Sequence, residues 1–207
     1  MMCYNYVNNQ MAAIYKNKIL HVSEDPIEIT EDGDYTLLSV GSSPSQNCYY
    51  IRSYIDPTQW YVLEYRNQND LFEENIPGSG LLVARWNDTV TLDYNGMFAN
   101  AFFDFYNQAH QYWIFRPGSS IDTVNGFINE AFFSQNLGQT AFGPTTDPHP
   151  YLTDGTPENS FEITDIYDHR DHLTFHVHFF EVAVEEFQLS ENVCVYPNPA
   201  TDVVNVE

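Results

Sequence analysis

The residues best suited to chemistry lie in one histidine-rich stretch, His169-Arg-Asp-His172-Leu-Thr-Phe-His176-Val-His178. A strand alternates its side chains between two faces, so His172, His176 and His178 would share one face, with apolar residues on the other. A His-x-His pair can chelate Zn²⁺ or Cu²⁺ when a carboxylate joins it. This spacing makes the stretch a candidate metal site.

Two interpretations of this face stay open. In the first, His176 and His178 hold a metal ion together with Glu162 or Asp168 from the neighbouring strand, and the full candidate set of imidazoles includes His172. In the second, the face is solvated and histidine only fills polar positions, because the sequence identifies no group that would orient the rings.

No familiar catalytic motif accompanies these imidazoles. None of the seven histidines opens a His-Glu-x-x-His motif, in which two histidines hold zinc and the glutamate acts as general base. No Ser–His–Asp or Cys–His arrangement stands out either. Cys3, Cys48 and Cys194 are too few for a disulfide framework or a cysteine zinc site, although a Cys3–Cys48 disulfide stays open. We therefore expect no catalysis by this chain alone.

Charge and length restrict the class of protein. The 207 residues suffice for one domain, or for one domain and a fragment. With 29 acidic and 7 basic residues, the formal net charge of −22 disfavours nucleic acid and anionic lipid as partners. Acidic loops could hold Ca²⁺, although a merely solvating acidic surface explains most of the carboxylates. We expect no membrane-spanning segment, because no apolar run is long enough.

Short runs rich in Tyr, Ile, Val and Leu, separated by turn residues, predict the elements that must position these groups. Strands are expected at Ile14–Val22, Asp34–Val40, Cys48–Ile55, Trp60–Arg66, Leu81–Trp86, Gln111–Phe115, Phe161–Tyr167 and His172–Val184. Short helices are expected at Tyr4–Tyr15 and Phe127–Ser134. The fold class is therefore mainly β, an antiparallel β-sandwich or irregular β-sheet with one or two short helices.

Two local features carry structural predictions. Glu64 and Arg66 share one face of the strand Trp60–Arg66, so we expect a structural ion pair in preference to a catalytic carboxylate. Gly78 and Gly80 flank a serine just before an apolar strand, and at least one of these glycines should have a positive φ.

The central segments resemble the region after the catalytic helix in M6-family metallopeptidases, the immune-inhibitor-A-like group. The segments in family order are Trp60-Tyr-Val-Leu-Glu64-Tyr-Arg66-Asn-Gln68, Ile76-Pro-Gly-Ser-Gly-Leu-Leu-Val83, Trp113-Ile-Phe-Arg-Pro-Gly118, Asp154–Thr156, Phe161–Ile166 and Leu173–Phe175. They cover about residues 30–182. Arg85-Trp86-Asn87-Asp88 stands where much of the family has His-x-Asp, so no role for that histidine carries over.

The last residues resemble another element of secreted proteins. Val195-Tyr-Pro-Asn-Pro199, followed by Ala200-Thr-Asp202 and alternating valines, is similar to the opening of the type IX secretion (Por) C-terminal sorting domain of Bacteroidetes. The two prolines predict an extended linker entering a strand. The domain division is then a β-rich domain at 1–184, a linker at 185–194 and a truncated sorting domain at 195–207. A lone strand cannot bury its apolar face, so Pro197–Glu207 should lie at the periphery.

Together the resemblances imply a non-catalytic C-terminal portion of a secreted zinc metallopeptidase of Bacteroidetes. Its zinc would lie only in the catalytic part of the parent, and its partners would be that catalytic domain and the secretion machinery. The location would be secreted or at the cell surface. Because the N-terminus does not have the pattern of a signal peptide, we expect a piece of a longer precursor.

Two other functions stay open. One is an autonomous cell-surface module that binds glycan or protein through aromatic clusters such as Tyr49-Tyr50, Trp60-Tyr61 and Phe102-Phe103. The other is a metal enzyme of unknown type that uses the histidine face. An exposed, contiguous aromatic patch would favour the first, and a stoichiometric transition metal would favour the second.

Overall fold

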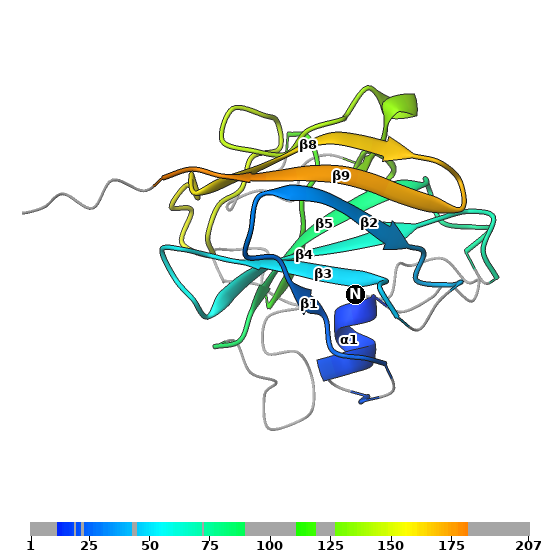
Figure 1. Ribbon diagram of the computed structural model, residues 1–207, viewed down its shortest axis with the longest axis horizontal. Coiled ribbons are helices and arrows are strands. Elements are labelled where there is room, and N and C mark those ends of the chain that lie inside the picture. Colours follow the sequence, from blue (N-terminus) through cyan, green and yellow to red (C-terminus); the bar gives the residue numbers. More distant parts are fainter. Residues whose placement is uncertain are drawn as a thin grey trace, which may run out of the picture.

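The chain forms two β-sheets packed face to face, with one helix on the outer side of the larger sheet (Figure 1). The computed structural model describes residues 12–18, 20–21, 23–42, 45–71, 73–89, 111–118 and 127–181. The larger sheet has the order β1-β3-β4-β5-β6, with β7 also paired to β5, and the smaller has the order β2-β9-β8. All pairings between named strands are antiparallel except β1 with β3. The mainly β sandwich expected from the sequence is confirmed.

The elements of this part of the chain are short. They are α1 (Ala13–Lys18), β1 (Ile27–Glu28), β2 (Gly33–Leu38), β3 (Cys48–Arg52), β4 (Gln59–Arg66), β5 (Gly80–Asn87), β6 (Tyr112–Ile114), the 3-10 helix η1 (Ile128–Glu130), β7 (Phe132–Phe133), the 3-10 helix η2 (Gln135–Leu137), β8 (Phe161–Asp168) and β9 (His172–Phe179).

Strands β4 and β5 form the middle of the larger sheet and are buried along their whole length. Tyr61, Leu63 and Tyr65 face the smaller sheet, whereas Trp60 and Val62 face α1. This division matches the alternation expected for the strand. The β4–β5 hairpin therefore joins the two apolar layers of the molecule.

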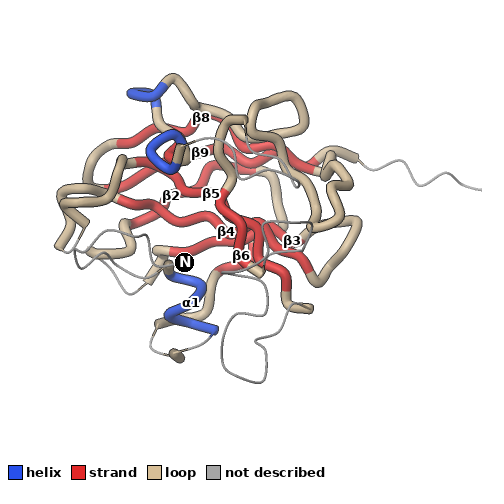
Figure 2. The backbone as a smooth tube through the Cα atoms, turned by 180° about the vertical axis from the view of Figure 1, so that it is seen from behind, coloured by secondary structure: helices blue, strands red, loops and turns tan. Residues whose placement is uncertain are grey.

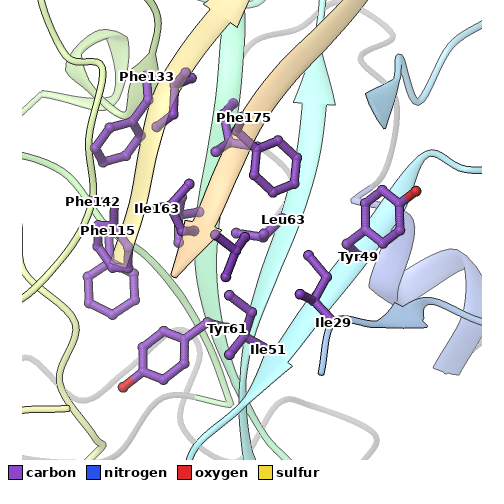
Figure 3. Packing of buried hydrophobic residues seen from close by; sticks show 14 of the residues in the cluster. Ile29, Tyr49, Ile51, Tyr61, Leu63, Phe115, Phe133, Phe142, Ile163 and Phe175 are labelled. Atoms are coloured by element: carbon purple, nitrogen blue, oxygen red, sulfur yellow. The ribbon is translucent and has the colours of Figure 1, made fainter. Parts of the chain in front are cut away.

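Aromatic rings fill much of the space between the two sheets (Figure 3). Phe142 lies in the middle of this core, with its ring centroid 5.0 Å from that of Phe115 and 5.7 Å from that of Phe133. Its backbone also pairs with Ile163 of β8. Edge and tilted ring pairs of this kind stabilise a core beyond the burial of their area.

The strand expected at Ile14–Val22 is wrong, because residues 13–18 form helix α1 (Figure 2). The β-rich composition of this run misled the prediction. Ala13, Ile14 and Tyr15 are buried in the apolar cluster on the outer face of the larger sheet. The side-chain amide of Asn17, also buried, donates hydrogen bonds to the segment 23–25 that follows the helix. Lys16 and Lys18 lie in the last turn, where cations suit the helix dipole. The expected helix at 4–15 overlaps α1 at residues 13–15, and its first eight residues lie outside the described part.

The helix expected at Phe127–Ser134 is also wrong beyond the single 3-10 turn of η1. Phe132 and Phe133 are buried in different clusters on opposite sides of the sheet, and only an extended chain can point neighbouring side chains in this way. They pair with Leu82 and Leu81 of β5. Burial on two faces therefore overrides the local helical pattern.

The strand predicted at His172–Val184 ends earlier, at Phe179, and residues 182–184 lie outside the described part. The other strand predictions are confirmed to within three residues, and β1 was not expected. β3 ends at Arg52 because the Ser53 hydroxyl accepts hydrogen bonds from the backbone N–H groups of Ile55 and Asp56, which turns the chain. The domain limits at 184 and 194, the peripheral placement of 197–207, and Cys3 and Cys194 all fall outside the described residues. Cys48 is a buried free thiol.

Gly80 has the positive φ expected at this turn, +146°, while Gly78 packs its backbone against the Phe132 ring. A Cβ at Gly80 would overlap the carbonyl oxygen of Phe133 and lie 3.0 Å from its carbonyl carbon. We expect Gly80→Ala to lower the free energy of unfolding by about 2–3 kcal/mol, because backbone strain and displacement of β7 add together.

Gly118→Ala is the matched control for this substitution. Gly118 also has a positive φ, +68°, but a Cβ there meets nothing within 4 Å. Urea unfolding should show a smaller loss, about 1 kcal/mol, for the control. Equal losses at the two sites would mean that the approach of β7 to Gly80 contributes nothing.

Candidate functional site

The histidine face occupies the outer side of strand β9 in the smaller sheet. The strand buries Leu173, Phe175 and Val177 in the core between the sheets. His176 and His178 therefore emerge on the opposite side, with side chains 37% and 44% exposed. The alternation expected from the sequence positions these imidazoles.

Two aspartates form hydrogen bonds with these rings. Asp34 belongs to the neighbouring strand β2, and Asp32 lies just before that strand. The Nδ1 atom of His176 lies 2.8 Å from a carboxylate oxygen of Asp34, and that of His178 lies 2.7 Å from one of Asp32. Asp34 and His176 are register partners between β2 and β9. Asp32 also accepts the backbone N–H of Phe179, and this hydrogen bond, followed by that from His178, lowers the pKa of Asp32.

His172 lies on the same face but apart from the other two. It lies four positions before His176 on the strand, about 13 Å along the chain. Its Nδ1 atom contacts the Asp171 carboxylate at 2.7 Å, and its ring stacks on His169 at 4.5 Å between centroids. The structure thus brings together His176 and His178 and leaves His172 with a separate neighbour.

The two carboxylates suggested by the sequence differ in their availability. Asp168 is occupied, because its Oδ1 accepts hydrogen bonds from the Tyr65 hydroxyl at 2.6 Å and from the backbone N–H of Arg170 at 2.7 Å. Glu162 stands opposite His178 in the β8–β9 register, and within the described ranges its carboxylate has no hydrogen bond or ion pair. As the side chains stand, those ranges contain no group of three or more His, Cys, Asp or Glu arranged to hold a metal.

A buried charge cluster, Glu64–Arg66–Glu73, lies on the face of β4 that meets α1. Arg66 pairs with Glu64 at 3.3 Å, which confirms the ion pair expected from the sequence, and with Glu73 at 2.6 Å. The second oxygen of Glu64 accepts the backbone N–H of Ala13 at 2.7 Å. Burial alone would lower the pKa of Arg66, but the carboxylates of Glu64 and Glu73 raise it above its usual value.

The Glu64–Arg66–Glu73 cluster has a structural role. Its three side chains are at most 9% exposed, and each carboxylate binds the same guanidinium. Sequence reasoning missed Glu73, because it comes from the turn between β4 and β5 and not from a strand with readable alternation. Burial raises the pKa of the Cys48 thiol beside this cluster, and Glu64 adds to the effect, so the thiol stays protonated.

Arg85, the first residue of the departure from the family pattern, is buried between the two sheets. Its Nη1 donates to the carbonyl oxygen of Tyr151 at 3.1 Å, and its guanidinium lies 5.4 Å from the centre of that ring. Burial lowers the pKa of Arg85 to about 10, so it remains a cation at neutral pH. Its Nε and the hydroxyl of Tyr61 across the strand pair are buried and have no hydrogen-bond partner among the described residues.

No family model, curated protein or solved structure matches this chain. The resemblances to M6 peptidases and to the sorting domain accordingly stay predictions from the sequence. Among the residues described, no helix is long and apolar enough to cross a membrane.

Proposed function

We propose that this chain is the non-catalytic, β-rich C-terminal portion of a secreted zinc metallopeptidase of the M6 kind. In this role, the two packed sheets hold in place the part of the parent protein that precedes them. Proteolysis belongs to the parent protein. A sorting signal at the end of the chain would direct export through type IX secretion, and the catalytic domain and that machinery are the partners.

The observation that carries the proposal is the Glu64–Arg66–Glu73 cluster. All three residues lie in or between two of the segments that resemble the family, 60–68 and 76–83. Glu64 binds the first backbone N–H of α1, and Arg66 ties the β4 strand to the following turn. Glu64, which belongs to the first of these segments, thus helps to hold α1 on the sheet, as a joint to a preceding domain would require.

The packing of α1 supports the same role. Tyr15 of the helix contacts the rings of Trp86 and Tyr112 at 5.4 and 5.2 Å between centroids. Ala13 and Ile14 are buried in the same cluster. A six-residue helix is not stable by itself, so these contacts and the Glu64 hydrogen bond fix its position.

We expect the purified chain, supplied with Zn²⁺ and Ca²⁺, to hydrolyse no peptide bond. Zinc proteolysis requires an open metal held by three protein ligands and a carboxylate that takes a proton from the bound water. Turnover of casein and of a quenched fluorescent peptide measures this directly. Chelator-sensitive hydrolysis that His176→Ala abolishes would overturn the proposal in favour of a metal enzyme.

A further inference from the structure

We propose that His176 and His178 form a binding site for a divalent transition metal ion, with Asp34 and Asp32 orienting the two imidazoles. This inference is independent of the proposed function, because the histidine face lies in the other sheet from the Glu64–Arg66–Glu73 cluster. The site is one for capture of Zn²⁺ or Cu²⁺, the ions that imidazole nitrogens favour.

The two aspartates determine which nitrogen of each ring carries the proton. An aspartate carboxylate accepts hydrogen bonds, so the nitrogen facing it carries the proton in the neutral ring. Both rings turn Nδ1 to a carboxylate, at 2.8 Å for His176 and 2.7 Å for His178. The Nε2 atom then holds the lone pair that a metal requires. A carboxylate behind a ligating histidine is the usual arrangement in metal sites, and it raises the basicity of the ligand.

The other nitrogen of each ring, Nε2, is left available for a metal ion. Neither Nε2 atom accepts or donates a hydrogen bond within the described ranges, and both rings are more than a third exposed. The two residues are next neighbours on one face of a strand, so their Cβ atoms are about 6.6 Å apart. Histidine side chains at this separation can converge on one ion.

Negatively charged groups surround the two rings. Asp32 and Asp34 lie behind the rings, Glu162 stands opposite His178, and the whole chain carries a formal charge of −22. Negative charge of this kind attracts a cation over the whole surface. Because Glu162 makes no ion pair with any residue that the structure describes, its side chain is available to turn toward His178 and supply a third ligand. Asp168 cannot do so, since Tyr65 and Arg170 occupy its carboxylate.

Calorimetric titration of the full chain with Zn²⁺ and with Cu²⁺, in a non-chelating buffer near pH 7, tests the site. We expect His176→Gln and His178→Gln each to weaken one binding event at least tenfold. His149→Gln is the matched control, because His149 is exposed and lies outside β9. His172→Gln should also leave this binding event unchanged. Binding that survives unaltered in both the His176 and His178 variants would overturn the proposal.

Asp34→Asn tests the orienting role separately from the ligands. The amide oxygen still accepts a hydrogen bond, but it lacks the negative charge that makes Nε2 a better ligand for the metal. The affinity for the metal ion should therefore fall about tenfold. Nitrogen NMR of the rings should show the proton on Nδ1 and a metal-induced shift at Nε2 in the unaltered chain. Protons on Nε2 in both rings before metal addition would contradict the proposal. Unchanged thermal melting of the metal-free variants would show that the fold is intact.

Discussion

Replacing Arg66 with methionine is expected to lower the free energy of unfolding by about 3–5 kcal/mol, because it leaves two buried carboxylates without their cation. Glu64 and Glu73 have side chains only 1% exposed, so water cannot replace the guanidinium. Urea unfolding measures the loss.

Two further variants make this expectation specific. Arg52→Met breaks the pair with Glu28, whose partners are 37% and 34% exposed, and it should change stability by no more than about 1 kcal/mol. Adding Glu64→Gln and Glu73→Gln to Arg66→Met should recover much of the loss, because no buried charge is then left over. If Arg66→Met behaves like Arg52→Met, the cluster does not hold the helix and the sheet together.

Removing the ring of Phe142 is expected to be similarly damaging, at about 3–5 kcal/mol for Phe142→Ala. The side chain is fully buried and has Phe115, Phe133, Tyr61 and Phe161 around it. These rings come from both sides of the core, so the cavity cannot close by a small shift of one strand.

Phe127→Ala is the control for this second expectation. Phe127 is 71% exposed, and its truncation should change stability by less than about 0.5 kcal/mol. Phe142→Leu should lie between the two, because it leaves a smaller cavity. A loss of less than about 1 kcal/mol for Phe142→Ala would mean that the two sheets do not share the tightly packed core described for the fold.

The strands could be predicted from the sequence wherever one of their faces is buried and the alternation is regular. Trp60–Arg66 and Leu81–Trp86 were read correctly, and so were the Glu64–Arg66 pair and the positive φ of Gly80. The errors at α1 and at Phe132–Phe133 share a cause. In both, burial against a distant strand decides the conformation, and the local composition does not contain that information.

The candidate metal site was only partly predictable. The alternation of His176 and His178 is a local property of one strand, so the sequence was sufficient. Their partners Asp32 and Asp34 depend on the register between β2 and β9, which are separated by more than a hundred residues. Asp34 was expected at the start of a strand, but nothing in the sequence indicated which other strand it would pair with.

Reading the gene upstream of this segment tests the central claim, membership of a secreted M6-like metallopeptidase, most directly. The account predicts that the same reading frame continues upstream and encodes a His-Glu-x-x-His motif on a helical segment before the residues that form α1. It also predicts a signal peptide at the start of that frame. A continuous upstream frame without a zinc-binding motif would contradict the account. Translation that begins at Met1 would contradict it as well.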